Sequence, residues 1–397
     1  MSHSTFNIQN STLLPSLAVE LAALDARGLR RRRRLLESPQ SAHVMVDGRE
    51  AVAFCSNDYL GLAADPRLIA AACEGAQRSG VGAGASHLIL GHAQAHHELE
   101  AALAEFTGLP SALLFSTGYM ANIGIVTALA GRNDAVFADK LNHASLNDAA
   151  LLSRASFKRY AHGDLGALER LLAATTARRK LVVTDAVFSM DGDIAPVPEL
   201  LRLCEKHDAW LMLDDAHGFG VLGARGGGVL QHFGVASPRI IYMATLGKAA
   251  GVSGAFAAGE PELIETLVQS ARTYIYTTAT PPLLAHALLA SLDIMAREQG
   301  RRDLLAQLIR QFKEGVAGLR WPLMPSDTAI QPLVIGGNAE VLRVSAALAA
   351  RGVLVPAIRP PTVPAGSARL RVSLSAAHTS EDVAQLVEAL QQVEKAS

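Results

Sequence analysis

Short apolar runs alternate with helical patterns through the middle of this 397-residue chain. Runs of strand length lie at 112–115, 135–138, 181–184, 210–213 and 240–244, and helical patterns are found at 119–130, 144–153 and 197–207. This alternation predicts an α/β fold, in which a largely parallel central sheet carries helices on both faces.

Polar clusters follow these predicted strands, at the point where each one ends. They are Ser116–Tyr119, Asp139–His143, Asp185–Asp193, Asp214–His217 and Thr245–Lys248. Ligands of open α/β sheets bind beyond the carboxyl ends of the strands. We therefore expect these clusters to meet in a single site.

Lys248 is the only charged residue between Arg239 and Glu260. A lysine delivered from a strand end into neutral surroundings is poorly solvated, so its pKa should fall. A neutral amine can form a Schiff base with a carbonyl group. A lysine that extends its tip into water is the alternative, and this stretch alone does not separate the two.

The outer parts of the chain have a different texture. We expect an amphipathic helix over 12–30, with Leu14, Leu17, Leu21 and Leu24 at helical spacing, and a strand at 44–54. A helix at 96–107 should end at Gly108. Further helices are expected at 283–297 and 301–316, with strands at 330–335, 353–358 and 369–374, and a last helix after Thr379. We therefore divide the chain into an N-terminal segment (1–50), a large α/β domain (51–285) and a small α+β domain (286–397).

The bulk composition favours a cytoplasmic enzyme. A net charge of −1 gives no general attraction to nucleic acid or to anionic membranes. No apolar run is long enough to span a membrane, and no secretory leader is visible. The three cysteines are widely spaced and predict no disulfide framework. The run Arg30–Arg34 could be a solvated helix end, a nucleic-acid arm, or a contact for an anionic substrate or acidic carrier protein.

Other motifs are compatible with a functional role and with a simpler structural one. Asp214 ends an apolar strand, where a carboxylate could pair with a protonated pyridine nitrogen or cap a turn. Ser116–Tyr119 opens a helix and could hold a phosphate, and His143 could stack on a cofactor or lie on the surface. Arg371, in a late strand, could bind a carboxylate.

Three further patterns do not support a site. Gly80–Gly84 follows a helical segment rather than a strand, so it is no dinucleotide fingerprint. The residues before and after Lys248 do not fit a phosphate-binding Walker loop. His92 and His96 have helical spacing, but the sequence shows no clear third ligand, so we expect no metal and interpret them as residues at a helix start.

In combination, these motifs resemble the PLP-dependent α-oxoamine synthase family of the fold-type I aminotransferase superfamily, over roughly residues 20–395. The resemblance is carried by Ser56–Leu62, Phe115–Asn122, Asn142–Leu146, Phe188–Asp193, Asp214–Gly218 and Thr245–Lys248. It implies pyridoxal 5'-phosphate (PLP) as cofactor, and a homodimer with the active site at the subunit interface.

The resemblance also implies residue roles. Lys248 would carry PLP as a Schiff base, Asp214 would pair with the pyridine nitrogen, and His217 and Ser189 would face the phenolic oxygen. His143 would stack on the ring and contact substrate, while Gly118, Tyr119 and Thr245 would seat the phosphate or cofactor. Arg371 would take the amino-acid carboxylate, Asn57, Arg31 and Thr362 would contact substrate, and Tyr276–Thr278 could reach the partner's phosphate.

Within the family, Ala357–Gly366 and Ala368–Arg371 resemble the members that condense L-alanine with a pimeloyl thioester in biotin biosynthesis. Such an acyltransferase would use pimeloyl-CoA or a pimeloyl carrier protein. The alternatives are a sibling synthase that uses glycine and another acyl-CoA, an aminotransferase, and a non-catalytic protein that binds polyanions through Arg30–Arg34.

Overall fold

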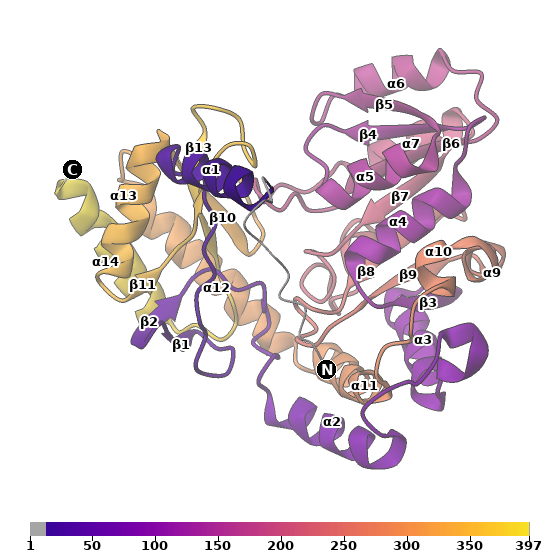
Figure 1. Ribbon diagram of the computed structural model, residues 1–397, viewed down its shortest axis with the longest axis horizontal. Helices are drawn as coiled ribbons and strands as arrows, with labels where there is room; N and C mark the ends of the chain where they lie inside the picture. The colour runs from indigo at the N-terminus through magenta and orange to yellow at the C-terminus, as the bar shows by residue number, and fades with distance from the viewer. Residues whose placement is uncertain (1–12, 397) are drawn as a thin grey trace, which may run out of the picture.

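The computed structural model describes residues 13–396. Figure 1 shows a larger body built around a wide sheet, and beside it a smaller body that contains the C-terminus. The wide sheet has seven strands in the order β3-β9-β8-β7-β6-β4-β5. These strands are β3 (Ser111–Phe115), β4 (Ala135–Asp139), β5 (Ser156–Tyr160), β6 (Lys180–Asp185), β7 (Trp210–Asp214), β8 (Ile240–Thr245) and β9 (Ala255–Gly259).

The predicted α/β architecture is confirmed. Strands β4 to β8 pair in parallel, and β9 alone runs antiparallel to its neighbours β3 and β8. Side chains alternate between the faces, so Leu181 and Val183 join one apolar cluster while Val182 joins the other. Both faces are therefore buried, as the continuous apolar runs require.

Strands β5 and β9 are not among the strands expected from the sequence. Strand β5 is the polar edge sequence Ser-Phe-Lys-Arg-Tyr, which has no apolar run to mark it, and charged residues suit an exposed edge. Strand β9, Ala-Phe-Ala-Ala-Gly, is fully buried between two strands, although its small residues have weak strand propensity. Its pairing with β3 and β8 therefore comes from tertiary structure.

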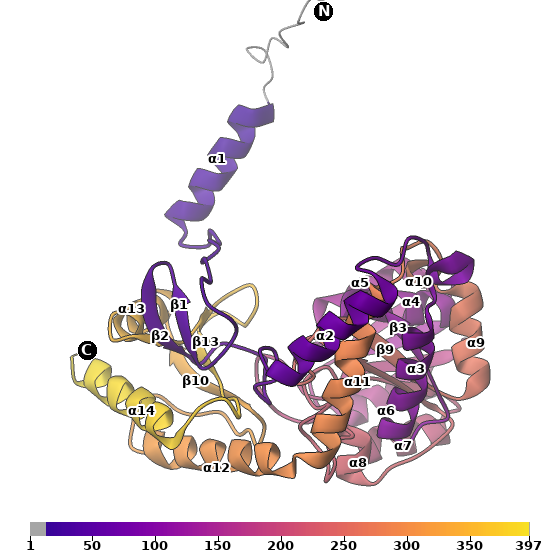
Figure 2. The ribbon, with the colours of Figure 1, turned by 90° about the horizontal axis from the view of Figure 1, so that it is seen from below.

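Helices cover both faces of the large sheet (Figures 1 and 2). One face packs against α4 (Gly118–Leu129), α5 (Ala144–Ser153), α9 (Pro261–Ser270) and α10 (Arg272–Ile275). The other face packs against α2 (Pro66–Ser79), α3 (Gln94–Thr107), α6 (Leu165–Ala173), α7 (Val197–Lys206), α8 (Val229–Phe233) and α11 (Pro282–Arg297). The short η2 (His87–Gly91) precedes α3. No helix in the described part of the chain has the length and apolar character needed to cross a bilayer.

The smaller body combines both ends of the chain. Strands β10 (Ile330–Gly336), β13 (Ala368–Ser373) and β12 (Ala357–Ile358) form one sheet, and β1 (His43–Val46), β2 (Arg49–Ala53) and β11 (Val353–Leu354) form another. Around them lie α12 (Gln299–Val316), α13 (Asn338–Ala349) and α14 (Ser380–Lys395). The expected strand 353–358 is split in two, because Pro356 has no N–H to continue a ladder.

The domain limits proposed from sequence fall inside continuous elements. Residue 50 lies within β2, which pairs in parallel with β11 of the small body. Residue 285 lies within α11, which packs against α2 and α3 of the large body. Neither strand pairing nor helix packing across such sequence distances is encoded in local composition.

Helix α1 (Leu13–Ala26) extends away from both bodies and has no buried residue (Figure 2). Leu14, Leu17, Leu21 and Leu24, expected on an apolar face, are all exposed. Residue 12, where this helix was expected to begin, lies outside the described residues. The leucines of α1 are thus left largely exposed within the described part of a single chain.

Asp65 joins the start of α2 to the small body, and its replacement should lower stability. Its side chain accepts from Arg67 N at 3.0 Å and pairs with Arg301 at 3.0 Å. Asp65→Ala should reduce the free energy of unfolding by about 2 kcal/mol at pH 7, because a cap and an ion pair are lost. The side-chain hydrogen bond from Arg67 lowers the pKa of Asp65 from 3.8 to about 2.

This contribution is present above pH 3.8 and is lost as the pH falls through about 2. Denaturant melts at pH 7 and pH 2 should therefore show a difference between parent and variant that shrinks in acid. Asp303→Ala, at an exposed position on α12, is the control and should change stability by less than about 0.5 kcal/mol. An equal loss in both variants would contradict the assignment.

Candidate active site

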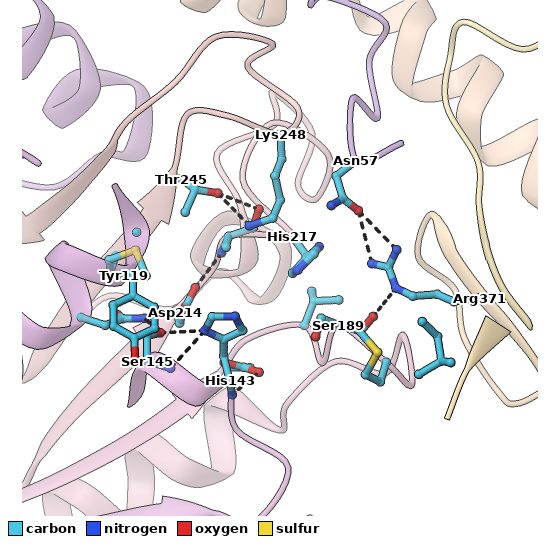
Figure 3. A pocket seen from close by; sticks show the side chains of 18 of the residues that line it. Asn57, Tyr119, His143, Ser145, Ser189, Asp214, His217, Thr245, Lys248 and Arg371 are labelled. Atoms are coloured by element: carbon cyan, nitrogen blue, oxygen red, sulfur yellow. Dashed lines mark hydrogen bonds between the residues drawn. The ribbon is translucent and has the colours of Figure 1, made fainter. Parts of the chain in front are cut away.

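The carboxyl ends of the large-sheet strands and the edge of the small body enclose a cavity of about 430 Å³. Figure 3 shows Lys248, Asp214 and His143 on the large-body side of this space, with Arg371 entering from β13. The cavity is lined by Asn57, Gly118, Tyr119, Asn122, His143, Ser145, Asp185, Val187, Ser189, Met190, Asp214, Ala216, His217, Met243, Thr245, Lys248, Pro356, Ile358 and Arg371. The polar clusters after the strands do meet in one site.

Lys248 follows β8 in a turn and is only half-buried, with its Nζ 3.0 Å from Thr245 Oγ1. Burial lowers the pKa of Lys248, while the nearby carboxylates Asp214 and Asp185 oppose this shift. The amine is therefore partly desolvated, and it faces the cavity rather than bulk water.

A hydrogen-bonded chain links Asp214 to His143. Asn122 Nδ2 donates to Asp214 Oδ2 at 2.7 Å and also lies 2.8 Å from Ser145 Oγ. Ser145 Oγ is 2.7 Å from His143 Nδ1. Since Asn122 and Ser145 are almost fully buried, they fix the orientation of the carboxylate and of the imidazole that face the cavity.

Asp185 is a second buried carboxylate at this site. Its Oδ2 accepts from His143 N at 3.0 Å, but its Oδ1 has no hydrogen-bond partner among the described residues. Burial, and then the charge of Asp214, raise the pKa of Asp185 well above its usual value. The cavity thus has two adjacent carboxylates that would both gain from a cationic ligand.

A second chain links His217 to Arg371. The Tyr59 hydroxyl lies 2.7 Å from His217 Nδ1 and 3.1 Å from Asn57 Oδ1. Asn57 Oδ1 in turn accepts from the Arg371 guanidinium at 3.3 Å. Burial, and then the positive charge of Lys248, hold the pKa of His217 well below its usual range, so this imidazole is neutral.

Arg371 is buried, with 6% of its surface exposed, and no carboxylate between residues 13 and 396 pairs with it. Its donors are used by Ser189 O, Asn57 Oδ1 and Ser373 Oγ. The neighbouring Arg369 pairs with Asp191. A buried guanidinium without a carboxylate is suited to bind an anionic ligand.

Gly118 opens α4 at the edge of the cavity, where Thr117 caps the helix by accepting from Met120 N at 3.1 Å. A Cβ at Gly118 would lie 2.5 Å from Thr245 Cγ2, so no larger residue fits there. Gly118 and Tyr119 line the cavity at this helix start, and the free backbone N–H groups of a helix start are suited to bind an anion. The Tyr119 hydroxyl donates to Asp148.

Comparison with known proteins agrees with this geometry. Residues 49–390 match the family model for aminotransferase class I and II. An 8-amino-7-oxononanoate synthase from Nitrosospira multiformis is 68% identical over 93% of this chain and 93% of its own. The chain belongs to the 8-amino-7-oxononanoate synthase family. Two solved structures have the same fold. A serine palmitoyltransferase from Sphingomonas wittichii has a TM-score of 0.91 and 31% identity, over 97% of this chain and 98% of that chain. A structure described as SPT with PLP has a TM-score of 0.92 and 30% identity, over 97% of this chain and 99% of that chain.

Not all site residues expected from sequence line the cavity. Asn57, Gly118, Tyr119, His143, Ser189, Asp214, His217, Thr245, Lys248 and Arg371 do so. Arg31 and Thr362 are exposed and lie outside the lining. The two segments are linked nearby, because the Arg359 guanidinium donates to Gly28 O. Their contact with a substrate of this synthase family stays a prediction.

Several lining or supporting residues were not singled out from sequence. Asn122 lies one helical turn beyond Gly118, so its spacing could have placed it on the cavity side of α4. Asp185 ends β6 in the same way that Asp214 ends β7, and the two are register partners. Tyr59 gave no such signal, because its link to His217 spans 158 residues.

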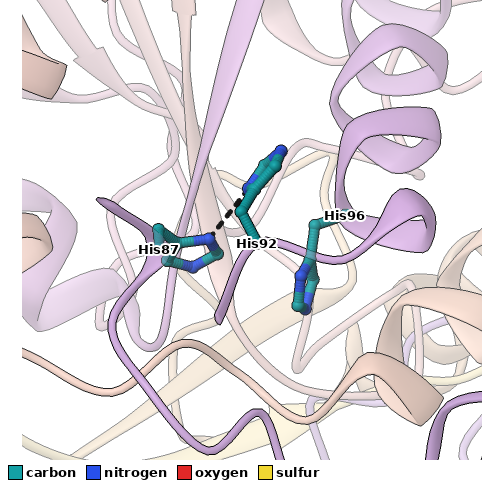
Figure 4. A group of neighbouring side chains, drawn as sticks. All are labelled: His87, His92 and His96. Carbon is teal, nitrogen blue, oxygen red and sulfur yellow. Dashed lines mark hydrogen bonds between the residues drawn. The ribbon is translucent and has the colours of Figure 1, made fainter. Parts of the chain in front are cut away.

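A separate histidine cluster lies beside α3 (Figure 4). Three ring nitrogens, one each from His87, His92 and His96, lie within 4.8 Å of one another, and His87 was not expected as a member. His96 Nδ1 accepts from Ala93 N at 3.0 Å, and its Nε2 lies 2.9 Å from Thr280 O. His87 and His92 are joined through their Nδ1 atoms at 3.0 Å. These bonds use both ring nitrogens of His96 but only the Nδ1 atoms of His87 and His92, so the expectation that no metal binds here stays a prediction.

Proposed function

We propose that this chain is a PLP-dependent acyltransferase that condenses L-alanine with a pimeloyl thioester. The products would be 8-amino-7-oxononanoate, CO2 and the free thiol, in biotin biosynthesis. One observation carries the proposal: a partly desolvated lysine, a buried carboxylate and an arginine with no carboxylate partner among the described residues share one cavity, in a chain 68% identical to a relative of that name.

The residues of the cavity fit PLP. Lys248 would bind the aldehyde of the cofactor covalently, and Asp214 would accept from its protonated pyridine nitrogen. The helix start at Gly118, which leaves no room for a Cβ beside Thr245, would receive the phosphate. His143, whose orientation is fixed by Ser145, would lie against the ring, and the neutral His217 and Ser189 would face the phenolic oxygen.

PLP, when bound, supplies an electron sink that stabilises negative charge at the amino-acid Cα. Arg371 would bind the alanine carboxylate through its planar guanidinium and so set the direction of the Cα–H bond. Lys248 Nζ, as a free amine of lowered pKa, would take the proton from Cα. The Asp214 side chain lines the same cavity and is held in place by Asn122 Nδ2 at 2.7 Å and by Ala216 N at 3.1 Å.

The acyl donor would approach from the side of the small body. Pro356 and Ile358 line the cavity there, and the proline-rich loop 359–366 follows β12. Arg30–Arg34 leads from α1 to the small body, near the Gly28–Arg359 link, and would attract the phosphates of CoA or an acidic carrier protein.

The proposal includes a homodimer in the cytoplasm. Support for the dimer comes from exposed apolar side chains on separate elements: Leu14 and Leu17 on α1, Ile89 and Leu90 on η2, and Tyr276. The last begins Tyr276–Thr278, the segment expected to reach the partner's phosphate. Three free cysteines suit a reducing compartment.

The test is product identification by mass after mixing PLP-loaded enzyme with alanine and pimeloyl-CoA, or with pimeloyl carrier protein. Formation of 8-amino-7-oxononanoate with one CO2 per thiol released is the expected result. Preference for glycine and another acyl-CoA would indicate a sibling synthase. Conversion of the cofactor to its amine form with a keto-acid product, without thioester, would indicate an aminotransferase.

Replacing Arg371 should weaken amino-acid binding more than turnover. Arg371→Gln removes the guanidinium, which would make two charge-assisted hydrogen bonds with the alanine carboxylate. KM for alanine should therefore rise about tenfold to a hundredfold, with a smaller change in KM for the thioester. Arg371→Lys keeps the charge without the fork and should fall between parent and Gln variant. Steady-state kinetics with each substrate varied in turn measure both effects, and an unchanged KM for alanine would disprove this role.

A further inference from the structure

The segment Phe188–Asp193 lies between the two bodies and contacts the functional arginine. Ser189 O accepts from Arg371 Nε, and Asp191 pairs with Arg369. Gly192 O accepts from Ser326 Oγ at 2.9 Å and from Thr328 Oγ1 at 3.0 Å. The small body thus binds this segment through two backbone carbonyl groups and through the carboxylate of Asp191.

Gly192 fixes how closely the segment approaches the small body. Its φ is +76°, and a Cβ there would lie 2.4 Å from Ile330 O. No other residue type fits without displacement. These contacts all come from the small body, so the position of Ser189 also depends on how the large body holds the segment.

His162 holds the segment from the side of the large body. Its Nδ1 lies 3.1 Å from both oxygens of Asp139, at the end of β4, and its Nε2 lies 3.0 Å from Asp193 Oδ2. The ring also meets Phe188 edge to face, with centroids 4.4 Å apart. Because both nitrogens face carboxylate oxygens, both must carry protons, so the bridge is an imidazolium between two carboxylates.

The β4 end of this bridge is rigid. Asp139 is 2% exposed and also accepts from Leu141 N at 2.8 Å and from Gly163 N at 3.0 Å. The hydrogen bonds with Asp139 and then Asp193 raise the pKa of His162 to about 10. Asp193 has fewer side-chain contacts than Asp139, since its Oδ2 faces His162 and its buried Oδ1 has no hydrogen-bond partner among the described residues.

We propose that His162 is a positioning residue for the amino-acid carboxylate: by tying Asp193 to Asp139 it fixes the segment whose Ser189 carbonyl orients Arg371. His162 itself is not part of the cavity lining. The proposal rests on the role of Arg371 given above. It adds that the affinity for the amino acid is set in part by an ion-pair bridge on the far side of the segment.

The experiment compares His162→Gln, Asp193→Asn and the double variant in the PLP-loaded enzyme. Affinity is measured as the spectral change on adding L-alanine, glycine or L-serine without any thioester, together with KM and kcat in the full reaction. In each single variant, the dissociation constant for the amino acid that the parent enzyme binds best should rise about tenfold, while kcat should change less than about threefold. The double variant should match the single ones, because both remove the same bridge.

The proposal is overturned if the single effects multiply in the double variant, if amino-acid affinity is unchanged, or if kcat falls as much as affinity. Should His162→Gln fail to fold, Asp193→Asn alone decides, since it breaks the bridge from the loop side and leaves Asp139 untouched. His232→Gln, at an exposed histidine of α8, is the matched control. The thioester-free titration separates this idea from the proposed function: failure to make 8-amino-7-oxononanoate leaves the affinity comparison intact.

Discussion

Lys248→Ala should lose nearly all turnover and all covalent attachment of the cofactor. The variant lacks both the amine that would bind PLP and the base that would take the Cα proton, so the rate should fall by about 10⁴-fold. Borohydride reduction followed by peptide mass analysis should find the cofactor on the peptide containing Lys248 in the parent, and on no peptide in the variant. The lowered pKa of Lys248, caused by burial, favours the neutral amine that this proposed role requires.

Lys206→Ala is the matched control for this experiment. Lys206 is an exposed lysine whose Nζ pairs with Glu169 at 2.6 Å, remote from the lining of the cavity. Its loss should leave rate and labelling within about twofold of the parent, as for most surface substitutions. If Lys248→Ala kept a tenth of the parent activity, or if label appeared on another lysine, the central assignment would be wrong.

Asp214→Asn should leave cofactor binding largely intact while slowing proton abstraction. Asparagine can keep one hydrogen bond from Asn122 or from Ala216 N, but it has no charge to hold a pyridine nitrogen protonated. Loss of this electrostatic support should slow exchange of the alanine Cα proton by about 100- to 1,000-fold. The exchange is followed by NMR in D2O with alanine alone, so no acyl donor enters the measurement.

The control for this variant is Asp208→Asn, which alters an aspartate whose side chain is 88% exposed. Its φ of +50° is tolerated by asparagine, so the fold should not change. Normal exchange in Asp214→Asn would show that the carboxylate does not support charge at the cofactor. Complete loss of cofactor would instead assign it to binding alone.

The parts of the site predicted best lie next to strands that the sequence marks clearly. Strands β6, β7 and β8 are continuous apolar runs, and Asp214 and Lys248 follow such runs directly. The rule that ligands bind beyond the carboxyl ends of parallel strands then brings these residues together without any long-range information. The predicted cap of the last helix is also confirmed, since Thr379 and Asp382 bond each other's backbone N–H at 2.8 and 3.2 Å.

Contacts between distant segments were not predictable in the same way. Tyr59 reaches His217, Asn57 reaches Arg371, and His162 joins Asp139 to Asp193, across loops whose path no local pattern describes. The same is true of β2 with β11, which joins the start of the chain to its last quarter. In each case the partners are common residue types, and only their contact in the folded chain indicates a role for them.

Local sequence therefore determined the alternating strands and helices, the burial of the sheet on both faces, and the placing of Lys248 and Asp214 at or just beyond strand ends. These follow from periodicity and from the cost of placing a charge among apolar neighbours, which act over a few residues. Tertiary structure alone decided which residues orient them: Asn122 and Ser145 for Asp214 and His143, and Tyr59, Asn57 and Ser189 for His217 and Arg371. Such orientation depends on hydrogen bonds of about 3 Å between segments far apart in the chain, and only the packing of the whole chain brings their atoms that close.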